Sequence, residues 1–172
     1  GASGKKHYIV TLNIICMSYD FTTLCFIRFI SGVIALILVL LLWKHRHSKG
    51  AIYLILFEIS AAIWAFSDGF EAAAIFIPQK LLWAQIAYIG VTTSAVMFLM
   101  FALSYAGHTR LVNIKTFLIL MVIPIITIVM AFTNTSHELL WSKIVIIEGT
   151  NQSVYYYGPW FWAHVTYEYS TL

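Results

Sequence analysis

The chain has 172 residues, of which 61% are hydrophobic and only 10% are charged. Soluble domains carry roughly 25% charged residues, so the composition excludes an ordinary soluble protein and indicates an integral membrane protein. The net charge of +3 is small and the basic residues are scattered, which argues against a nucleic-acid-binding protein. We therefore expect the lipid bilayer, and no nucleic acid, as a partner.

The first twenty residues divide into two parts. Residues 1–4 contain no initiating Met and resemble the remnant of a removed tag, and residues 5–20 form an N-terminal extracytoplasmic segment. Residues 8–17 of that segment are apolar but too short to span a bilayer, so we predict an interfacial helix. Cys16 and Cys25 are expected to be unpaired apolar residues.

Four apolar runs are long enough to be membrane helices, at residues 21–43, 51–74, 81–106 and 112–132. A span needs about 20 residues. A fifth helix is predicted to begin at Pro159, because proline suits a first helical turn and the Trp and Phe residues that follow are typical of a membrane–water boundary. Pro159 to Leu172 is shorter than a span, so we expect the chain to end inside this helix.

The loop before the fifth helix contains two β-rich runs, residues 142–148 and 153–157, on either side of a Gly/Asn turn. This pattern predicts a β-hairpin. An isolated hairpin is marginally stable in water, so we expect it to cover the outer ends of the helices. The predicted fold class is an all-α membrane protein: a helix bundle with four full spans and the start of a fifth, plus a small extracytoplasmic β-hairpin.

Basic residues predict the orientation, because cytoplasmic loops carry an excess of Lys and Arg. The loops after the first and third spans hold Lys44, Arg46, Lys49, Arg110 and Lys115. The opposite side holds Lys80 and Lys143, together with Lys5 and Lys6. The asymmetry predicts a multi-pass plasma-membrane protein with its N-terminus outside.

Ionisable residues inside apolar spans mark candidate sites. In the second span, Trp64, Asp68 and Glu71 share one helical face, while Ala61, Ala65, Gly69 and Ala73 form a small-residue stripe for helix packing. Arg28 lies at a similar depth, about 10 Å inside the first span at 1.5 Å per residue, and is expected to pair with Asp68 or Glu71. Such a pair could fasten two helices or line an outward-facing ligand cavity.

Two further groups are candidates. His164 and Glu168 are four residues apart on one helical face, which permits a local hydrogen bond or, since imidazole titrates near neutral pH, ligand or proton sensing. Glu58 lies deeper in the second span without an obvious partner. Aromatic residues are dense on the outer side and suggest either an interfacial belt or a pocket for an apolar or amphiphilic ligand: Trp83, Trp141, Tyr155, Tyr156, Tyr157, Trp160, Phe161 and Trp162.

No nucleophile–base set, phosphate-binding loop or cluster of metal ligands is visible in the sequence. We therefore expect no catalytic residue, no metal and no cofactor in this chain.

The run Gly158-Pro159-Trp160-Phe161-Trp162-Ala163-His164-Val165-Thr166-Tyr167 resembles the fifth-helix signature of the N-terminal seven-helix sensor domain of bacterial and archaeal histidine kinases. Further stretches match in the family's order: Ile63-Trp64-Ala65 with Glu71, Lys80-Leu81-Leu82-Trp83-Ala84, Tyr88-Ile89-Gly90, Phe101-Ala102-Leu103 with Tyr105 and Gly107, Ile123-Pro124, and Thr133-Asn134 with His137, Leu140 and Trp141. Two positions depart from the family pattern, Gln85 in place of a frequent Arg and Glu168 in place of a small or apolar residue.

The resemblance implies that residues 21–172 are the incomplete sensory input domain of a signal-transduction receptor. The domain itself would not be an enzyme, although the full-length protein would be a histidine kinase, acting as a homodimer. It would detect an unknown small or amphiphilic ligand, extracytoplasmic or membrane-borne, and relay a helix rearrangement to a cytoplasmic output module. The candidate ligand-binding residues are Arg28, Trp64, Asp68, Glu71, Tyr88, His164 and Glu168.

An alternative function remains open on the residues alone. A small proton or ion transporter, or a channel subunit, could use Arg28, Glu58, Asp68 and Glu168 inside the membrane. A eukaryotic scaffold with a large outer loop is a third class, and the lack of cysteines in that loop argues against it.

Overall fold

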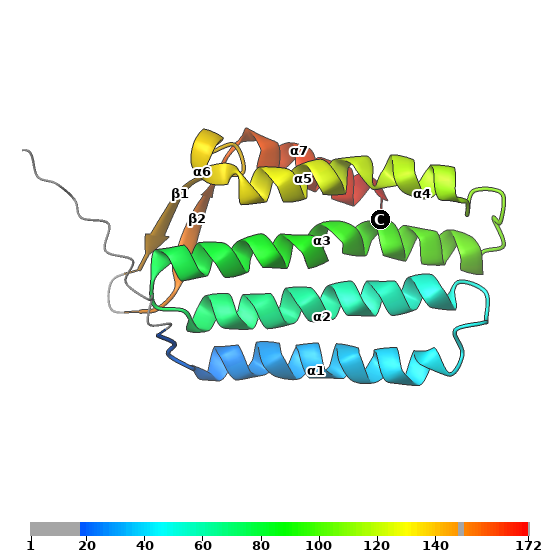
Figure 1. Ribbon diagram of the computed structural model, residues 1–172, viewed down its shortest axis with the longest axis horizontal. Coiled ribbons are helices and arrows are strands. Elements are labelled where there is room, and N and C mark those ends of the chain that lie inside the picture. The colour runs from blue at the N-terminus through cyan, green and yellow to red at the C-terminus, as the bar shows by residue number, and fades with distance from the viewer. Residues whose placement is uncertain (1–17, 148–149, 172) are drawn as a thin grey trace, which may run out of the picture.

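The computed structural model describes residues 18–147 and 150–171, and its long helices lie side by side in a row (Figure 1). The row consists of α1 (Thr23–Trp43), α2 (Ala51–Ala73), α3 (Ile77–Tyr105) and a fourth rod made of α4 (Ile114–Leu120) and α5 (Val122–Phe132). Each of these four is long and apolar enough to cross a membrane. The predicted all-α membrane fold is confirmed.

The remaining elements follow the fourth rod. They are the short α6 (Asn134–His137), the strands β1 (Trp141–Ile146) and β2 (Ser153–Tyr157), and α7 (Pro159–Thr171), which packs against α3 and α5. The strands form the predicted antiparallel hairpin, with Ile146 opposite Ser153 and Trp141 opposite Tyr157. We call the end of the bundle that carries these strands the hairpin end, and the opposite end, with the α1–α2 and α3–α4 connections, the basic end (Figure 1).

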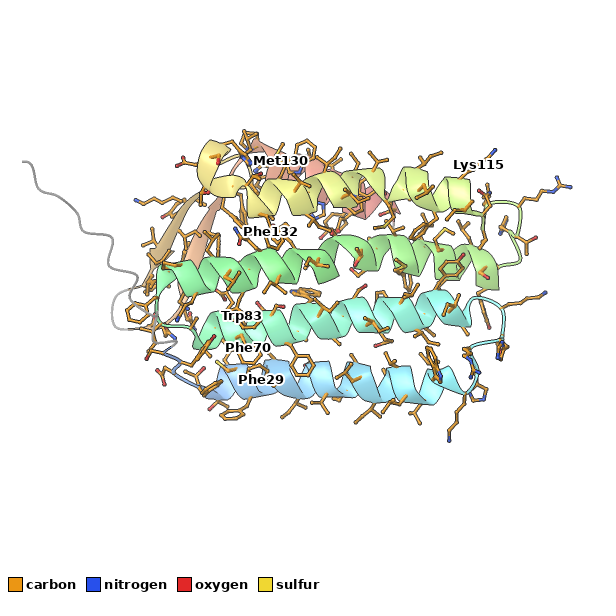
Figure 2. All side chains as sticks on the ribbon, viewed as in Figure 1. Phe29, Phe70, Trp83, Lys115, Met130 and Phe132 are labelled. Atoms are coloured by element: carbon orange, nitrogen blue, oxygen red, sulfur yellow. The ribbon has the colours of Figure 1, made fainter. Side chains whose placement is uncertain are left out.

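Small residues and aromatic rings hold the row together. A Cβ added to Gly90 of α3 would lie 2.3 Å from the Ser60 carbonyl oxygen of α2, so these two backbones are in direct contact. Gly69, from the predicted packing stripe, instead faces the ring of Phe29 on α1. Phe29, Phe70 and Trp83 then form a line of rings across α1, α2 and α3, with centroid separations of 5.0 and 4.5 Å (Figure 2).

One predicted helix start is wrong by four residues. Helix α3 begins at Ile77 rather than at residue 81, with Pro78 in its first turn. The apolar run was predicted to begin at about residue 81, directly after the charged Lys80. In the structure Lys80 is fully buried among protein groups, so the helix continues through it.

The predicted fourth span is divided in two. The chain makes a turn at Met121, between α4 and α5, and Pro124 follows. Proline has no N–H, so the carbonyl of Leu120 lacks the amide donor that a continuous helix would supply. The Tyr167 hydroxyl of α7 donates a hydrogen bond to this carbonyl at 2.5 Å, which meets the requirement that backbone polar groups at membrane depth be satisfied.

A second bond joins the same helices. The Trp160 indole N–H donates to the Thr127 hydroxyl at 3.1 Å. Trp160 and Tyr167 are seven residues apart on α7, as are Leu120 and Thr127 on the facing rod, so both bonds belong to one antiparallel register.

Some predictions lie outside the described residues. They concern the tag remnant, the interfacial helix at residues 8–17, Cys16, Lys5 and Lys6, and part of the hairpin turn. Of the two cysteines, Cys25 is described, and it is buried and free, as expected.

The hydrogen bond from Tyr167 to the Leu120 carbonyl can be tested by Tyr167→Phe. We expect this change to destabilise the domain by about 1–2 kcal/mol, because it leaves a buried carbonyl without a donor. Thermal unfolding in nanodiscs measures the change, and Tyr169→Phe serves as the control because Tyr169 is 79% exposed on the same helix. Pro124→Ala supplies an amide for Leu120, so Tyr167→Phe should cost less in that background; an equal cost in both backgrounds would contradict the assignment.

Candidate functional site

Arg28 and Asp68 form the pair that joins α1 to α2. Arg28 Nε lies 3.0 Å from Asp68 Oδ2, and Arg28 Nη1 donates to the backbone carbonyl of Asp68 at 3.0 Å. The predicted partner is therefore correct. Because one bond goes to the backbone, the guanidinium fastens the helix as well as the side chain.

Glu71 connects α2 to the hairpin. Its carboxylate accepts hydrogen bonds from the Ser153 hydroxyl and, at 2.8 Å, from the Tyr155 hydroxyl. Burial raises the pKa of Tyr155 well above its usual range, and the nearby Glu71 charge raises that pKa further. The phenol therefore keeps the proton that it donates. The predicted placement of the hairpin over the helix ends is confirmed.

Lys80 is the residue that sequence reasoning missed. Its side chain is 0% exposed, and its ammonium donates to the backbone carbonyls of Glu71 at 3.0 Å and Asn151 at 2.8 Å. Asn151 in turn donates to the carbonyls of Ala72 and Ala73. The last carbonyls of a helix lack intrahelical partners and attract cations. The sequence did contain a signal for this role: a lysine stands at the start of an apolar run, a few residues after the end of the preceding helix.

A cavity of about 280 Å³ lies between α2, α3, the hairpin and α7. The face shared by Trp64, Asp68 and Glu71 opens into it, and Tyr88 of α3 joins them. The complete lining is Trp64, Asp68, Glu71, Ala84, Ala87, Tyr88, Val91, Trp141, Tyr155, Tyr157 and Phe161. We call it the aromatic cavity.

Rings from distant parts of the chain form the walls of the aromatic cavity. Trp141 stands perpendicular to Tyr88 at 5.1 Å between ring centroids and lies 5.7 Å from Tyr155. Tyr157 and Phe161 stack at 3.7 Å. The predicted outer aromatic residues thus include a group that lines a pocket.

Asn134 of α6 fixes the backbone at Trp141, and Gly158 lies where β2 leads into α7. The Asn134 side chain accepts from the backbone N–H groups of Leu140 and Trp141 at 3.0 Å each and donates to the Trp141 carbonyl at 2.8 Å. A Cβ at Gly158 would lie 2.2 Å from the Leu139 carbonyl oxygen, so only glycine fits where the chain leaves the hairpin.

A second cavity, of about 610 Å³, lies between the start of α1, the end of α2 and the hairpin turn. We call it the polar cavity, and Arg28 and Glu71 face it. Its lining is Asp20, Thr22, Thr23, Leu24, Arg28, Glu71, Ala72, Thr150, Asn151, Gln152 and Ser153. Glu71 therefore stands between the two cavities.

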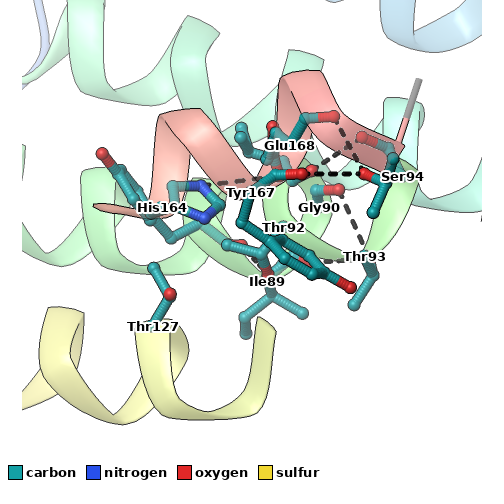
Figure 3. Close-up of polar contacts among 12 residues, drawn as sticks. Ile89, Gly90, Thr92, Thr93, Ser94, Thr127, His164, Tyr167 and Glu168 are labelled. Carbon is teal, nitrogen blue, oxygen red and sulfur yellow. Dashed lines mark hydrogen bonds and ion pairs between the residues drawn. The ribbon is translucent and has the colours of Figure 1, made fainter. Parts of the chain in front are cut away.

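His164 and Glu168 lie on α7, where they face α3 (Figure 3). His164 Nε2 is 3.4 Å from Glu168 Oε1, and the His164 ring is 5.9 Å from the ring of Tyr88. His164 is 2% exposed, and within the described part of the chain its Nδ1 has no hydrogen-bond partner. Neither residue of the pair lines either cavity, but the His164 ring lies near Tyr88, which lines the aromatic cavity.

The other acidic side chain of α2, Glu58, is half-buried and lies about 15 Å along the helix from Asp68 at 1.5 Å per residue. Across residues 18–147 and 150–171, no group of three or more His, Cys, Asp and Glu is placed to hold a metal ion.

The helices and cavities define a multi-pass membrane protein with a ligand-sized pocket near one end. Residues 27–172 match the family described as the N-terminal 7TM region of histidine kinase. The chain belongs to this family, the transmembrane sensor region of histidine kinases. No curated protein and no solved structure matches the chain.

The attachment of the hairpin can be tested by Lys80→Met. This change keeps an unbranched side chain but removes the donors to the Glu71 and Asn151 carbonyls. We expect faster amide hydrogen exchange in β2 and a lower unfolding temperature, because the buried carbonyls lose their partners. Lys143→Met removes an exposed lysine from β1 and should change neither; equal effects of the two changes would contradict the role of Lys80.

Proposed function

We propose that this domain is the input module of a receptor histidine kinase and binds its ligand in the aromatic cavity. The observation that carries the proposal is the convergence of Trp64, Asp68, Glu71 and Tyr88 on one cavity in a chain of the histidine-kinase sensor family. Arg28 supports this cavity through Asp68, and His164 and Glu168 support it through Tyr88.

The position of the cavity supports a relay. Its walls belong to two groups of elements: α2 and α3, whose backbones touch at Gly90, and the hairpin with α7. A ligand that contacts both groups favours one relative position of them over another, and a ligand shifts an equilibrium by its difference in affinity for the two states. A movement of α7 would then be passed on to the cytoplasmic output module of the full-length protein. We propose that this full-length protein acts as a homodimer.

We further propose that the hairpin end lies outside the cytoplasm. The basic end carries Lys44, Arg46, Lys49, Arg110 and Lys115. At the hairpin end, Lys80 is buried and bonded to carbonyls. Of the lysines described at that end, Lys143 is exposed. Among the described residues, the burial of Lys80 leaves Lys143 as the exposed lysine of the hairpin end, against five exposed basic residues at the basic end, which supports a cytoplasmic basic end.

The orientation can be checked by labelling with a membrane-impermeant maleimide in intact cells. In a background where Cys16 and Cys25 are replaced by Ala, Ser142→Cys on β1 should react, because it lies at the hairpin end. Ser48→Cys at the basic end should react only after permeabilisation. The opposite pattern would show that the protein has the reverse orientation.

The sensor function can be tested in the full-length protein reconstituted in liposomes, with autophosphorylation from labelled ATP as the readout. Asp68→Asn removes the carboxylate charge that pairs with Arg28, so the ion pair between α1 and α2 is lost. We therefore expect autophosphorylation to change at least severalfold. Glu138→Gln, which removes an exposed carboxylate outside both cavities, should leave it unchanged.

The same liposomes distinguish a sensor from a transporter. We expect no proton or ion flux through the protein. A flux that Glu58→Gln, Asp68→Asn or Glu168→Gln abolishes would replace the sensor function with transport.

A further inference from the structure

The charged groups of the aromatic cavity are all of one sign. Asp68 and Glu71 line it, and none of its described lining residues is a lysine or an arginine. Asp68 has a cationic partner in Arg28, which approaches from α1. Lys80 lies near Glu71, but its ammonium bonds to backbone carbonyls.

The hydrogen bonds described for the Glu71 carboxylate come from uncharged groups. The Ser153 and Tyr155 hydroxyls donate to the same oxygen, Oε1. None of the hydrogen bonds within residues 18–147 and 150–171 involves Glu71 Oε2, and the carboxylate lines the aromatic cavity. A positively charged ligand group would add the ionic partner that these hydroxyls do not provide.

The walls of the cavity suit a particular kind of cation. Five of its lining residues have aromatic rings that also pack on one another, namely Tyr88, Trp141, Tyr155, Tyr157 and Phe161. Aromatic faces attract a cation within about 6 Å of the ring centroid, and groups of such rings bind methylated ammonium. A small metal ion would instead need several oxygen ligands in place of its water.

The volume limits the ligand further. At about 280 Å³, the cavity is just below the range of roughly 300–1,000 Å³ that holds drug-sized ligands. It suits a group the size of a lipid headgroup amine, while a long apolar chain would extend beyond it.

We propose that the aromatic cavity binds a small organic cation, an alkylated ammonium group, with Glu71 as its ionic partner and Tyr88, Trp141 and Tyr155 as its aromatic walls. This names the ligand class of the sensor site and so rests on the proposed function. A neutral ligand of the same shape would bind more weakly, because it would bury the Glu71 carboxylate without giving it an ionic partner. The ammonium group can belong to a free solute or to a lipid headgroup.

The binding test uses the full-length protein in nanodiscs of phosphatidylglycerol, which contain no quaternary ammonium. We expect radiolabelled choline to bind saturably and tetramethylammonium to compete with it. The neutral carbon isostere of choline, in which carbon replaces the ammonium nitrogen, should not compete. Equal competition by the isostere would overturn the proposal without the need for any variant.

Two variants locate the binding. Glu71→Gln keeps a carbonyl oxygen for the Ser153 and Tyr155 hydroxyls but removes the charge, and it should weaken choline binding roughly tenfold. Trp141→Leu removes one aromatic wall and should weaken binding severalfold. Glu58→Gln removes a carboxylate from the same helix outside the cavity and should leave affinity unchanged. Unchanged affinity in both cavity variants would overturn the proposal.

Two additional measurements separate the possible sources and the two hypotheses. Nanodiscs of phosphatidylcholine should block choline binding if the cation is a headgroup, and leave it intact if the cation is a free solute. Choline binding that requires Glu71 without any change in autophosphorylation would support the site and contradict the relay. An autophosphorylation response to another compound, with no charge-dependent choline binding, would support the relay and overturn the cation site.

Discussion

The ammonium group of one buried lysine holds together the parts of the chain that form the site. Lys80 bonds to the Glu71 carbonyl at the end of α2 and to the Asn151 carbonyl in the hairpin turn. Burying a charge is costly unless strong acceptors replace its water, and the free carbonyls of a helix end are such acceptors. The position of the hairpin, and therefore of the aromatic cavity beneath it, depends on this group.

The same constraint explains other polar residues of the bundle. At three places where a helix is broken or ends, a side chain from a neighbouring element donates to a backbone carbonyl: Tyr167 to Leu120, Gln85 to Ala131, and Asn151 to Ala72. These residues complete backbone hydrogen bonding in a region where water is scarce. Both interpretations of the intramembrane charges apply to these residues: Arg28 fastens α1 to α2 and faces the polar cavity, and Glu71 binds the hairpin and faces both cavities.

The sequence predicted the helices and the hairpin because apolar length and residue periodicity are local properties. It also predicted the shared face of Trp64, Asp68 and Glu71, and a pair of Arg28 with Asp68 or Glu71. It did not predict the break before Pro124, the early start of α3 or the role of Lys80, since each depends on a donor or acceptor far away in the chain. The aromatic walls were missed as a specific set for the same reason: Tyr88, Trp141 and Phe161 come from three separate elements.

The missing backbone hydrogen bond at Pro124, in the rod made of α4 and α5, fixes the position of α7 along that rod. Pro124 leaves the Leu120 carbonyl without a backbone donor, and Tyr167 takes it. If α7 slid along α5 by one turn, Tyr167 would face a carbonyl that the helix already occupies, and Trp160 would leave Thr127. Sliding would therefore lose both bonds and gain none. If α7 carries the relay proposed above, a tilt about the line through these two bonds would keep both of them, whereas a piston stroke would break both.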